Sequence, residues 1–440
     1  MCITVIGAGL AGCEAAYQAA KRNVPVTLIE MKPLKRTPAH KIDGFAELVC
    51  SNSLKADRLD SAAGMLKEEM RRLDSLLMRC ADKCRVPAGG ALAVDRTLFS
   101  EYVTQEIRNN PNINVVNAEI TEIPMDGITV IATGPLTSDA LSADIQRRFG
   151  NALSFYDAAA PIVSADSIDP QRSFSASRYG KGDGDDYINC PMNKEEYDAF
   201  YDALISAERA PLHGFDVCDP KVYEGCMPVE VMAGRGRDTL RFGPMKPVGL
   251  TDPNTGRRPW AVLQLRKENV SSTMYNLVGF QTNLKFPEQK RVFGMIPALK
   301  NAEFLRYGVM HRNTFIDSPR LLTSAFSLRD EPRLFFAGQL TGVEGYMESG
   351  ASGLVAGINA ARAFEGKPLL SLPEVTMIGA LSAYISDESV KKFQPMGANL
   401  GVLPELSERP RDKKLRAAAY AQRAMEDLAG FCAENELIRK

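Results

Sequence analysis

A single cysteine stands among polar residues in the segment LVCSNSLKAD, which runs from Leu48 to Asp57. Cys50 is followed by three polar side chains, and Lys55 lies five positions further on. A structural thiol usually has apolar neighbours, whereas a thiol beside a cation or a helix N-terminus reacts readily because its thiolate is favoured. The pattern indicates a nucleophilic cysteine. A small buried residue is the alternative that the residue types leave open.

The first thirty residues, which precede this segment by only a few dozen positions, predict a complete strand-helix-strand unit. CITVIGAGLAG gives a buried strand over residues 2–6, a glycine turn and a helix over 10–22, and PVTLIE gives a second strand over 25–30. In such a unit the glycines permit a tight turn, a close approach to a pyrophosphate and close packing of helix on strand, and the strand-end acid faces a ribose. We therefore expect dinucleotide contacts from Gly7, Ala8, Gly9, Leu10, Ala11, Gly12 and Glu30.

A second glycine-rich segment near the other end of the chain favours FAD over NAD. LFFAGQLTGVEGYMESGASGLVAGINAA, residues 334–361, predicts a strand, a turn and a helix over Gly350 to Phe364, and ATG at 132–134 ends a return strand. Two nucleotide-facing turns in one chain are typical of two-part flavin folds, although a plain strand-turn-helix has the same pattern. The further cofactor contacts that we expect are Gly134, Gly338, Gln339, Gly350 and Gly353.

The remaining pattern predicts an α/β fold with an inserted domain. Helical periodicity appears between residues 57 and 83, Asp95 is placed to cap a helix through Arg108, and strands are predicted over 113–123 and 128–135. After about residue 155 short polar turns and strand-like runs at 260–265 and 275–280 replace this regularity. We expect a Rossmann-type FAD-binding domain built from residues 1–160 and 311–440, interrupted by a smaller α+β domain over 161–310.

Composition excludes several classes of protein. The 440 residues carry 53 basic and 54 acidic side chains, so whole-chain charge names no partner. Nine scattered cysteines suit a reducing cytoplasm, and Cys80 and Cys84, four apart, predict a core pair on one helix and not a zinc site. No apolar run reaches about 18 residues. We expect a cytoplasmic monomer without a metal or a membrane span.

Local charge points to a nucleic acid. Residues 231–300 hold twelve basic and four acidic side chains, interleaved with aromatic residues that include Trp260 and Phe286. Phosphate neutralisation together with ring stacking is how looped RNA is held, although many charge runs are only solvated faces. The RNA contacts that we expect are Arg257, Arg258, Lys285 and Arg291.

Seven segments carry a resemblance to a known family. They are TPAH (37–40), FAELVCSNSLKAD (45–57), RVPAGGALAVDR (85–96), EGCMPVEVMA (224–233), LRFGPMKPVGL (240–250), MHRNTFIDSP (310–319) and FFAGQLTGVEGYMESGASG (335–353). Together they resemble the folate- and FAD-dependent tRNA uridine-5-methyltransferase family, from the first strand to about residue 404.

The resemblance implies methylation of the T-loop uridine of tRNA at carbon 5. Its implied carbon donor is 5,10-methylenetetrahydrofolate, with reduced FAD as methylene carrier and reductant and with NADPH or NADH to restore the flavin. Carbon 5 becomes nucleophilic only after a thiolate adds to carbon 6, and its proton must later be removed. The family uses two cysteines for this, which correspond to Cys50, expected as nucleophile, and Cys226, expected as acid or base. His311, in MHRNT, is implied to contact the flavin or the pterin, or to have a structural role.

Three alternatives remain open from the sequence. The same chemistry could act on a uridine of ribosomal RNA. A flavin oxidoreductase acting on a small molecule or a disulfide would make the basic insertion incidental, but the sequence has no CxxC pair. A non-catalytic flavoprotein that binds RNA would need neither Cys50 nor Cys226.

Overall fold

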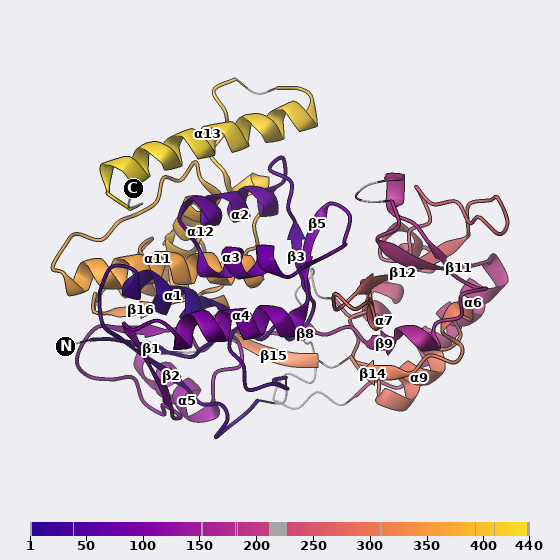
Figure 1. Cartoon of the computed structure of the whole chain (residues 1–440), viewed down its shortest axis with the longest axis horizontal. Coiled ribbons are helices and arrows are strands. Elements are labelled where there is room, and N and C mark those ends of the chain that lie inside the picture. Colours follow the sequence, from indigo (N-terminus) through magenta and orange to yellow (C-terminus); the bar gives the residue numbers. More distant parts are fainter. Residues whose placement is uncertain are drawn as a thin grey trace.

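The computed structural model of the chain describes residues 2–37, 39–150, 153–180, 182, 184–210, 227–308, 310–391, 393–408 and 410–437, with only the backbone of 153–158 and 311–314. These residues form two lobes with separate hydrophobic cores (Figure 1). One core draws its residues from Ile3–Ile145 and Phe315–Leu437, and the other from Val163–Ala302. The larger lobe is thus built from both ends of the chain.

A five-stranded parallel sheet lies at the centre of the larger lobe, with the strand order β16-β7-β1-β2-β6. Its strands are β1 (Ile3–Ile6), β2 (Val26–Glu30), β6 (Ile113–Asn117), β7 (Thr129–Ile131) and β16 (Leu334–Phe336). β1 has β2 on one side and β7 on the other, so the connections diverge from the carboxyl end of β1. Open α/β sheets have their ligand crevice at such a point.

Two helices, α1 (Leu10–Ala20) and α11 (Tyr346–Phe364), pack against each other on one side of this sheet, and α5 (Asp139–Phe149) lies on the other side (Figure 1). The crossing is close because α11 presents glycines to α1. A Cβ atom added at Gly353 would lie 2.2 Å from the carbonyl oxygen of Ala11, and one at Gly357 would lie 2.4 Å from that of Ala15. No larger residue fits at either glycine without moving the helices apart.

Further helices cover α1 and α11, and buried carboxylates cap two of them. They are α2 (Ala62–Arg72), α3 (Leu76–Lys83), α4 (Arg96–Arg108), α10 (Ser318–Leu321), α12 (Met377–Ser386) and α13 (Lys413–Glu434). Glu14 accepts hydrogen bonds from the first amides of α3, and Glu69 accepts them from Met377 and Ile378 at the start of α12. Burial raises the pKa of Glu14 and raises that of Glu69 to about 8.

The smaller lobe contains a six-stranded sheet with the order β10-β11-β12-β13-β9-β14. Its strands are β9 (Ile162–Ser164), β10 (Phe174–Ser175), β11 (Tyr187–Met192), β12 (Ala261–Lys267), β13 (Met274–Leu277) and β14 (Phe304–Arg306). Its helices are α6 (Lys194–Ser206), α7 (Val229–Ala233), α8 (Thr239–Phe242) and α9 (Phe286–Phe293). The antiparallel pair β8 (Leu153–Ala158) and β15 (Met310–Phe315) runs between the lobes (Figure 1).

A three-stranded sheet faces the smaller lobe from the larger one. It consists of β3 (Ser53–Ala56), β5 (Ala91–Val94) and β4 (Arg85–Val86), with β5 in the middle. β3 begins three residues after Cys50, so this sheet fixes the chain on one side of the cysteine. No helix in the described part of the chain combines the length and the hydropathy needed to cross a bilayer.

The sequence predicted most element types correctly, but several boundaries were wrong, among them the strand predicted over 128–135, which ends at Ile131. The helical segment between 57 and 83 is two helices, because the chain turns at Asp74 with a φ of 55°. The strand predicted over 113–123 ends at Asn117. The second glycine-rich helix begins at Tyr346, four residues before the predicted start, so Gly350 and Gly353 lie inside it. Asp95 caps α4 as predicted, accepting from the amides of Thr97 and Leu98.

Candidate functional site: a glycine turn and an adjoining cysteine segment

The turn between β1 and α1 has the shape that its glycines predict. Gly7 has a φ of 97°, and an added Cβ would lie 2.8 Å from the carbonyl oxygen of Ala132. A Cβ at Gly12 would lie 1.8 Å from the carbonyl oxygen of Gly7, so this glycine is needed for packing. At Gly9, by contrast, an added Cβ would meet nothing within 4 Å. Gly9 therefore leaves the N-terminus of α1 open to an anionic ligand.

A cavity lies at this turn, along the carboxyl ends of β1, β2 and β7, and includes Gly7, Ala8, Gly9 and Glu30 in its lining. The buried carboxylate of Glu30 accepts a hydrogen bond from the amide of Ala8 at 2.7 Å and one from the amide of Lys32 at 3.0 Å. Glu30 thus joins the end of β2 to the glycine turn. Its contact with a ribose hydroxyl stays a prediction.

Three residues of this cavity were missed by the sequence reasoning: His40, Lys32 and Glu47. Burial, together with the charge of Lys32, lowers the pKa of His40 to about 4, so its imidazole is neutral near pH 7. Its Nδ1 lies 2.6 Å from the hydroxyl of Thr37. His40 belongs to the TPAH motif, but the spacing of His40 from other polar residues did not predict that it lines a cavity.

The second glycine turn lies against the first. Gly338 follows β16 with a φ of 82°, its amide donates to the hydroxyl of Ser352 at 2.7 Å, and its Cβ position faces Ala11. The side-chain amide of Gln339 donates to Glu344 at 2.6 Å. Gly134, with a φ of 69°, faces open space.

The two helical glycines have a packing role in this structure. A Cβ at Gly350 would lie 2.6 Å from the side chain of Leu77, and Gly353 contacts Ala11 on α1. Their positions explain why glycine is required without invoking a ligand. That Gly350 and Gly353 contact the cofactor stays a prediction, as it does for Gly134, Gly338 and Gln339.

Cys50 lies on a short segment that connects the first glycine turn to α11. The amide of Ala46 donates to the carbonyl of Ala8 at 2.9 Å, and four residues later the amide of Cys50 donates to the hydroxyl of Tyr346 at 2.7 Å. The amide of Ser51 donates to the same hydroxyl at 3.2 Å. Four residues span at most about 14 Å. The thiol is therefore held close to the dinucleotide turn, in a partly exposed position.

Three arginines surround this segment. Arg306 donates to the carbonyl of Val49 at 2.5 Å, and Arg96 donates to that of Leu48 at 2.8 Å. Arg266 donates to the hydroxyl of Ser51 at 2.8 Å and to the side chain of Asn52 at 2.9 Å. Burial lowers the pKa of both Arg266 and Arg306. Nearby positive charge favours a thiolate over a thiol.

The sequence suggested Lys55 as the cation near the thiol, but in the structure these arginines have that position. Lys55 forms an ion pair with the buried Glu348 at 2.6 Å, which links the cysteine segment to the first turn of α11. The arginines were missed because they lie about 45 to 255 positions from Cys50, and only the fold brings them there.

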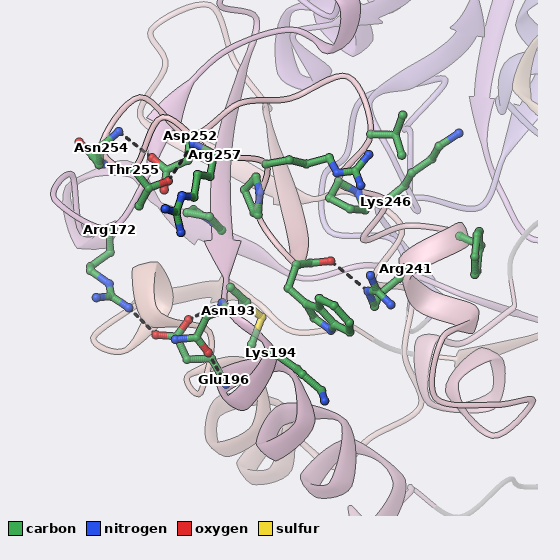
Figure 2. A pocket seen from close by; sticks show the side chains of 18 of the residues that line it. Arg172, Asn193, Lys194, Glu196, Arg241, Lys246, Asp252, Asn254, Thr255 and Arg257 are labelled. Atoms are coloured by element: carbon green, nitrogen blue, oxygen red, sulfur yellow. Dashed lines mark hydrogen bonds and ion pairs between the residues drawn. The ribbon is translucent and has the colours of Figure 1, made fainter.

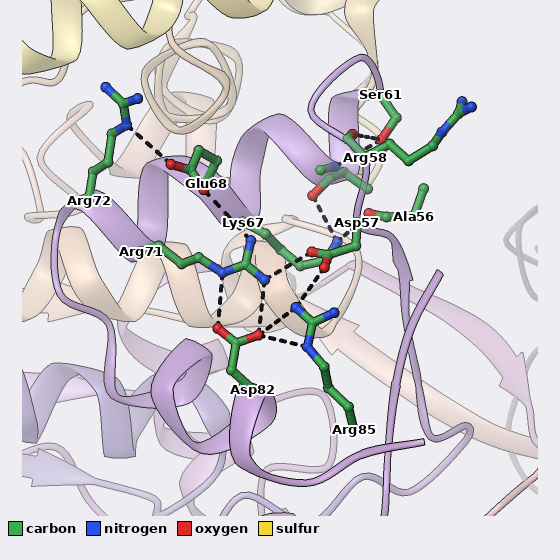
Figure 3. Close-up of polar contacts among 12 residues, drawn as sticks. Ala56, Asp57, Arg58, Ser61, Lys67, Glu68, Arg71, Arg72, Asp82 and Arg85 are labelled. Carbon is green, nitrogen blue, oxygen red and sulfur yellow. Dashed lines mark hydrogen bonds and ion pairs between the residues drawn. The ribbon is translucent and has the colours of Figure 1, made fainter. Parts of the chain in front are cut away.

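Charged side chains also fix the chain after β3 (Figure 3). Asp57 binds Arg71 at 3.0 Å and Arg85 at 2.7 Å, and Asp82 contacts both arginines at 3.1 Å and 2.6 Å. Lys67 donates to the carbonyl of Ala56 at 2.6 Å, and burial lowers its pKa to about 8. The segment that carries Cys50 is thus held at its start, its middle and its end.

The four predicted RNA contacts belong to the smaller lobe, and the side chains of the other two predicted residues are not described. Cys226 lies outside the described residues, and His311 is described only as a backbone position in β15, opposite Asp157 of β8. Lys285 is paired with Glu208, and Arg291 with Glu288, each at 2.6 Å on the surface. Arg257 and Arg258 line a hollow of the smaller lobe. Within the described ranges no cluster of three or more metal-ligating side chains was found.

The parallel sheet, its glycine turn and the acidic end of β2 define a dinucleotide-binding α/β protein with a Rossmann-type fold. The solved structure of Aquifex aeolicus GidA, in its form II crystal, superposes on the whole chain with a TM-score of 0.71 at 17% identity, covering 74% of that protein. The form I crystal gives the same TM-score at 16% identity. These likenesses establish the fold.

The sequence comparisons establish the family. The family described as "Glucose inhibited division protein A" matches residues 2–368. A methylenetetrahydrofolate--tRNA-(uracil-5-)-methyltransferase TrmFO of Acetivibrio thermocellus is 60% identical over 430 residues, 98% of each chain. A protein of the same name from Heliobacterium modesticaldum is 59% identical over the full length of both chains. The chain therefore belongs to the glucose inhibited division protein A family, together with the TrmFO proteins that it matches over its length.

Proposed function

We propose that this protein methylates carbon 5 of the T-loop uridine of tRNA, taking the carbon from 5,10-methylenetetrahydrofolate and using reduced FAD. The names of the relatives that match the chain over its whole length support this reaction. The structural observation that carries it is the segment from Ala46 to Cys50, which keeps a reactive type of side chain within about 14 Å of a dinucleotide turn.

The residues present suit FAD. A Cβ atom at Gly7 or Gly12 would clash with a backbone carbonyl, whereas Gly9 faces open space. The N-terminus of α1 favours the negative charge of a pyrophosphate. Glu30 stands at the end of β2, where it would exchange its bond with Ala8 for one with a ribose. Bound FAD supplies the transfer of the one-carbon unit and the hydride that reduces it to methyl. NADPH or NADH is the proposed source of reducing equivalents.

Cys50 would activate the uracil. Its thiolate adds to carbon 6, the ring electrons move to make carbon 5 nucleophilic, and the sulfur leaves again once the carbon 5 proton has been removed. The guanidinium groups of Arg266 and Arg306 lie beside the segment and would stabilise the thiolate. Cys226 is proposed as the acid or base on the ground of the family resemblance alone.

The RNA would contact the basic surface of the smaller lobe, where Arg257 and Arg258 lie, and Lys285 and Arg291 remain proposed contacts. Lys285 and Arg291 would have to exchange their carboxylate partners for phosphates. A cytoplasmic, monomeric enzyme is part of the same proposal.

The experiment is a label transfer. Purified protein is incubated with methylenetetrahydrofolate labelled in its one-carbon unit, NADPH and an unmodified tRNA transcript, and the labelled nucleotide is mapped by mass spectrometry after nuclease digestion. The proposal predicts label at carbon 5 of the T-loop uridine. Parallel incubations contain ribosomal RNA in place of tRNA, or labelled S-adenosylmethionine in place of the folate. Label found in ribosomal RNA but not in tRNA would show that ribosomal RNA is the substrate, and label taken from S-adenosylmethionine without reduced flavin would refute the mechanism.

A further inference from the structure

A hollow of the smaller lobe, about 1090 Å³ in volume, lies between the end of β11, the start of α6, α8 and the loop that precedes β12 (Figure 2). Trp260 lines it, and the amide of Trp260 donates to the carbonyl of Met192 at 3.1 Å. The residues labelled in Figure 2 come from three parts of the sequence: Arg172, the residues at the start of α6, and the stretch 241–257. It is a built concavity and not a flat charged face.

The hollow carries excess positive charge. Its lining includes two carboxylates, Glu196 and Asp252, against six cations, which are Arg172, Lys194, Arg241, Lys246, Arg257 and Arg258. Both carboxylates are already engaged. Glu196 accepts from Arg172 at 2.5 Å and caps α6, and Asp252 is buried and accepts from the amide of Asn254.

Four of the six cations have no carboxylate partner in the described part of the chain: Lys194, Lys246, Arg257 and Arg258. This separates the hollow from the nearby surface at α9, where Lys285 and Arg291 are both paired with acids. Cations without a partner can neutralise phosphates without first breaking an ion pair. Of the basic residues of 231–300, the hollow thus holds three that have no carboxylate partner in the described ranges: Lys246, Arg257 and Arg258.

Aromatic rings lie beside these charges. The guanidinium carbon of Arg241 lies 3.7 Å from the ring centroid of Trp260, and the indole remains 37% exposed. Phe242, the next residue on α8, is 83% exposed. A stacking ring next to free cations is the combination that holds an unpaired nucleotide, because the ring takes the base and the cations take the backbone.

The hollow is remote from the cysteine. β12 connects the two, with Trp260 just before its first residue and Lys267 at its end, where the Lys267 carbonyl accepts from Asn52 at 2.8 Å. Seven residues of extended strand span roughly 20 Å. A ligand in the hollow therefore cannot be the reacting uracil, nor a pyridine nucleotide that must reach the flavin beside Cys50.

We propose that this hollow binds an unpaired nucleotide of the RNA substrate, with its base stacked on Trp260 or Phe242 and its phosphates held by Arg257, Arg258 and Lys246. The RNA is then held at two points, one at each end of β12. The hollow contributes affinity and register, and it takes no part in the chemical step. This inference rests on the proposed function, because it assumes an RNA substrate.

Trp260 itself provides the test, since it is the only tryptophan of the chain. Holoenzyme is titrated with an unmodified tRNA transcript while tryptophan emission is followed. We expect saturable quenching whose midpoint agrees with the dissociation constant measured by filter binding. Fully paired duplex RNA and polyglutamate serve as comparison ligands. Equal quenching by the duplex would contradict the claim that the bound nucleotide is unpaired. Quenching by polyglutamate but not by tRNA would indicate that the hollow binds an acidic protein and not RNA.

Variants separate the hollow from the chemistry. Because Phe242 is highly exposed, Phe242→Ala should fold normally, and we expect it to weaken tRNA binding about fivefold or more. The double variant Arg257→Gln with Arg258→Gln should weaken it about tenfold and make the salt dependence shallower. Leu415→Ala and Arg320→Gln, which change exposed residues of the larger lobe, are the matched controls.

Methylation at saturating tRNA distinguishes the two claims. We expect the hollow variants to keep the wild-type rate there, with the loss confined to KM. If these variants bind tRNA as tightly as the wild type and still methylate it, the hollow is not an RNA site, and the proposed function is unaffected. Absence of methylation in the wild type would overturn the proposed function, while quenching of Trp260 by tRNA would still support the hollow as an RNA site.

Discussion

The hydroxyl of Tyr346 lies 2.7 Å from the backbone nitrogen of Cys50 and accepts its hydrogen bond. The two residues are 296 positions apart, and the amide of Ser51 donates to the same oxygen. Tyr346 is the first residue of α11, which packs against α1 through Gly353. The helix that closes the dinucleotide fold therefore also sets the position of the cysteine.

Replacing Tyr346 by phenylalanine tests this relationship. Tyr346→Phe leaves two backbone amides without their acceptor, which costs about 1–3 kcal/mol if the segment stays in place. We expect single-turnover methylation to slow about tenfold while the bound flavin is retained. The matched control is Tyr384→Phe, whose hydroxyl donates to the carbonyl of Gln394 away from this segment. Equal rates for Tyr346→Phe and the wild type would show that the bond does not position the thiol.

Arg306 should control the reactivity of the cysteine. Arg306→Met removes a partly buried cation that donates to the carbonyl of Val49, the neighbour of Cys50, while it keeps much of the side-chain volume. The thiolate then loses electrostatic support. Alkylation of Cys50 by iodoacetamide, followed by mass spectrometry of its peptide, should reach half its maximal rate at a higher pH. Arg320→Met, at an exposed surface ion pair, is the control and should leave the profile unchanged.

The glycines of α11 should be required for folding. Gly353→Ala forces a Cβ to within 2.2 Å of a backbone oxygen of α1, and such overpacking costs about 1–3 kcal/mol. Gly430→Ala, near the C-terminal end of α13, meets nothing within 4 Å and should stabilise the protein by about 0.5–1 kcal/mol. Urea unfolding of the two variants measures the difference. Equal stabilities would mean that α11 can move away from α1 without cost.

Glu69 predicts a pH dependence of stability. Burial raises its pKa to about 8, above the ordinary value of 4.5, so the unfolded chain ionises this carboxyl first. The stability that it contributes is complete below about pH 4.5 and is lost as the pH rises through 8. Glu69→Gln cannot ionise, so its free energy of unfolding should fall less than that of the wild type between pH 5 and 8, by about 2 kcal/mol or more. Parallel pH profiles would contradict the raised pKa.

The nucleotide turn could be predicted because its determinants are local. Gly7, Gly12, β1 and β2 lie within the first thirty residues; Gly7 has a φ of 97°, and Gly12 packs against the carbonyl of Gly7. Asp95 likewise caps α4 through amides two and three residues away. Motifs of this kind carry their structural context with them.

The surroundings of Cys50 could not be predicted in the same way. Arg96, Arg266 and Arg306 reach the segment from three different strands and helices, and Lys55, the cation near in sequence, is paired with Glu348 instead. The start of α11 was misjudged because Gly345 and Gly350 resemble turn residues, although Gly350 lies inside the helix, where an added Cβ would lie 2.6 Å from Leu77. Such contacts depend on the completed fold.

The central claim is that Cys50 is the nucleophile that activates the uracil. A T-arm RNA carrying 5-fluorouridine tests it most directly, because the fluorine cannot leave as the proton does and the thiol remains bonded to carbon 6. The account predicts a covalent protein–RNA band on a denaturing gel for the wild type and for Cys226→Ala. It predicts none for Cys50→Ala, with FAD retained in all three proteins. An adduct that persists in Cys50→Ala and disappears in Cys226→Ala would contradict the claim and exchange the two roles.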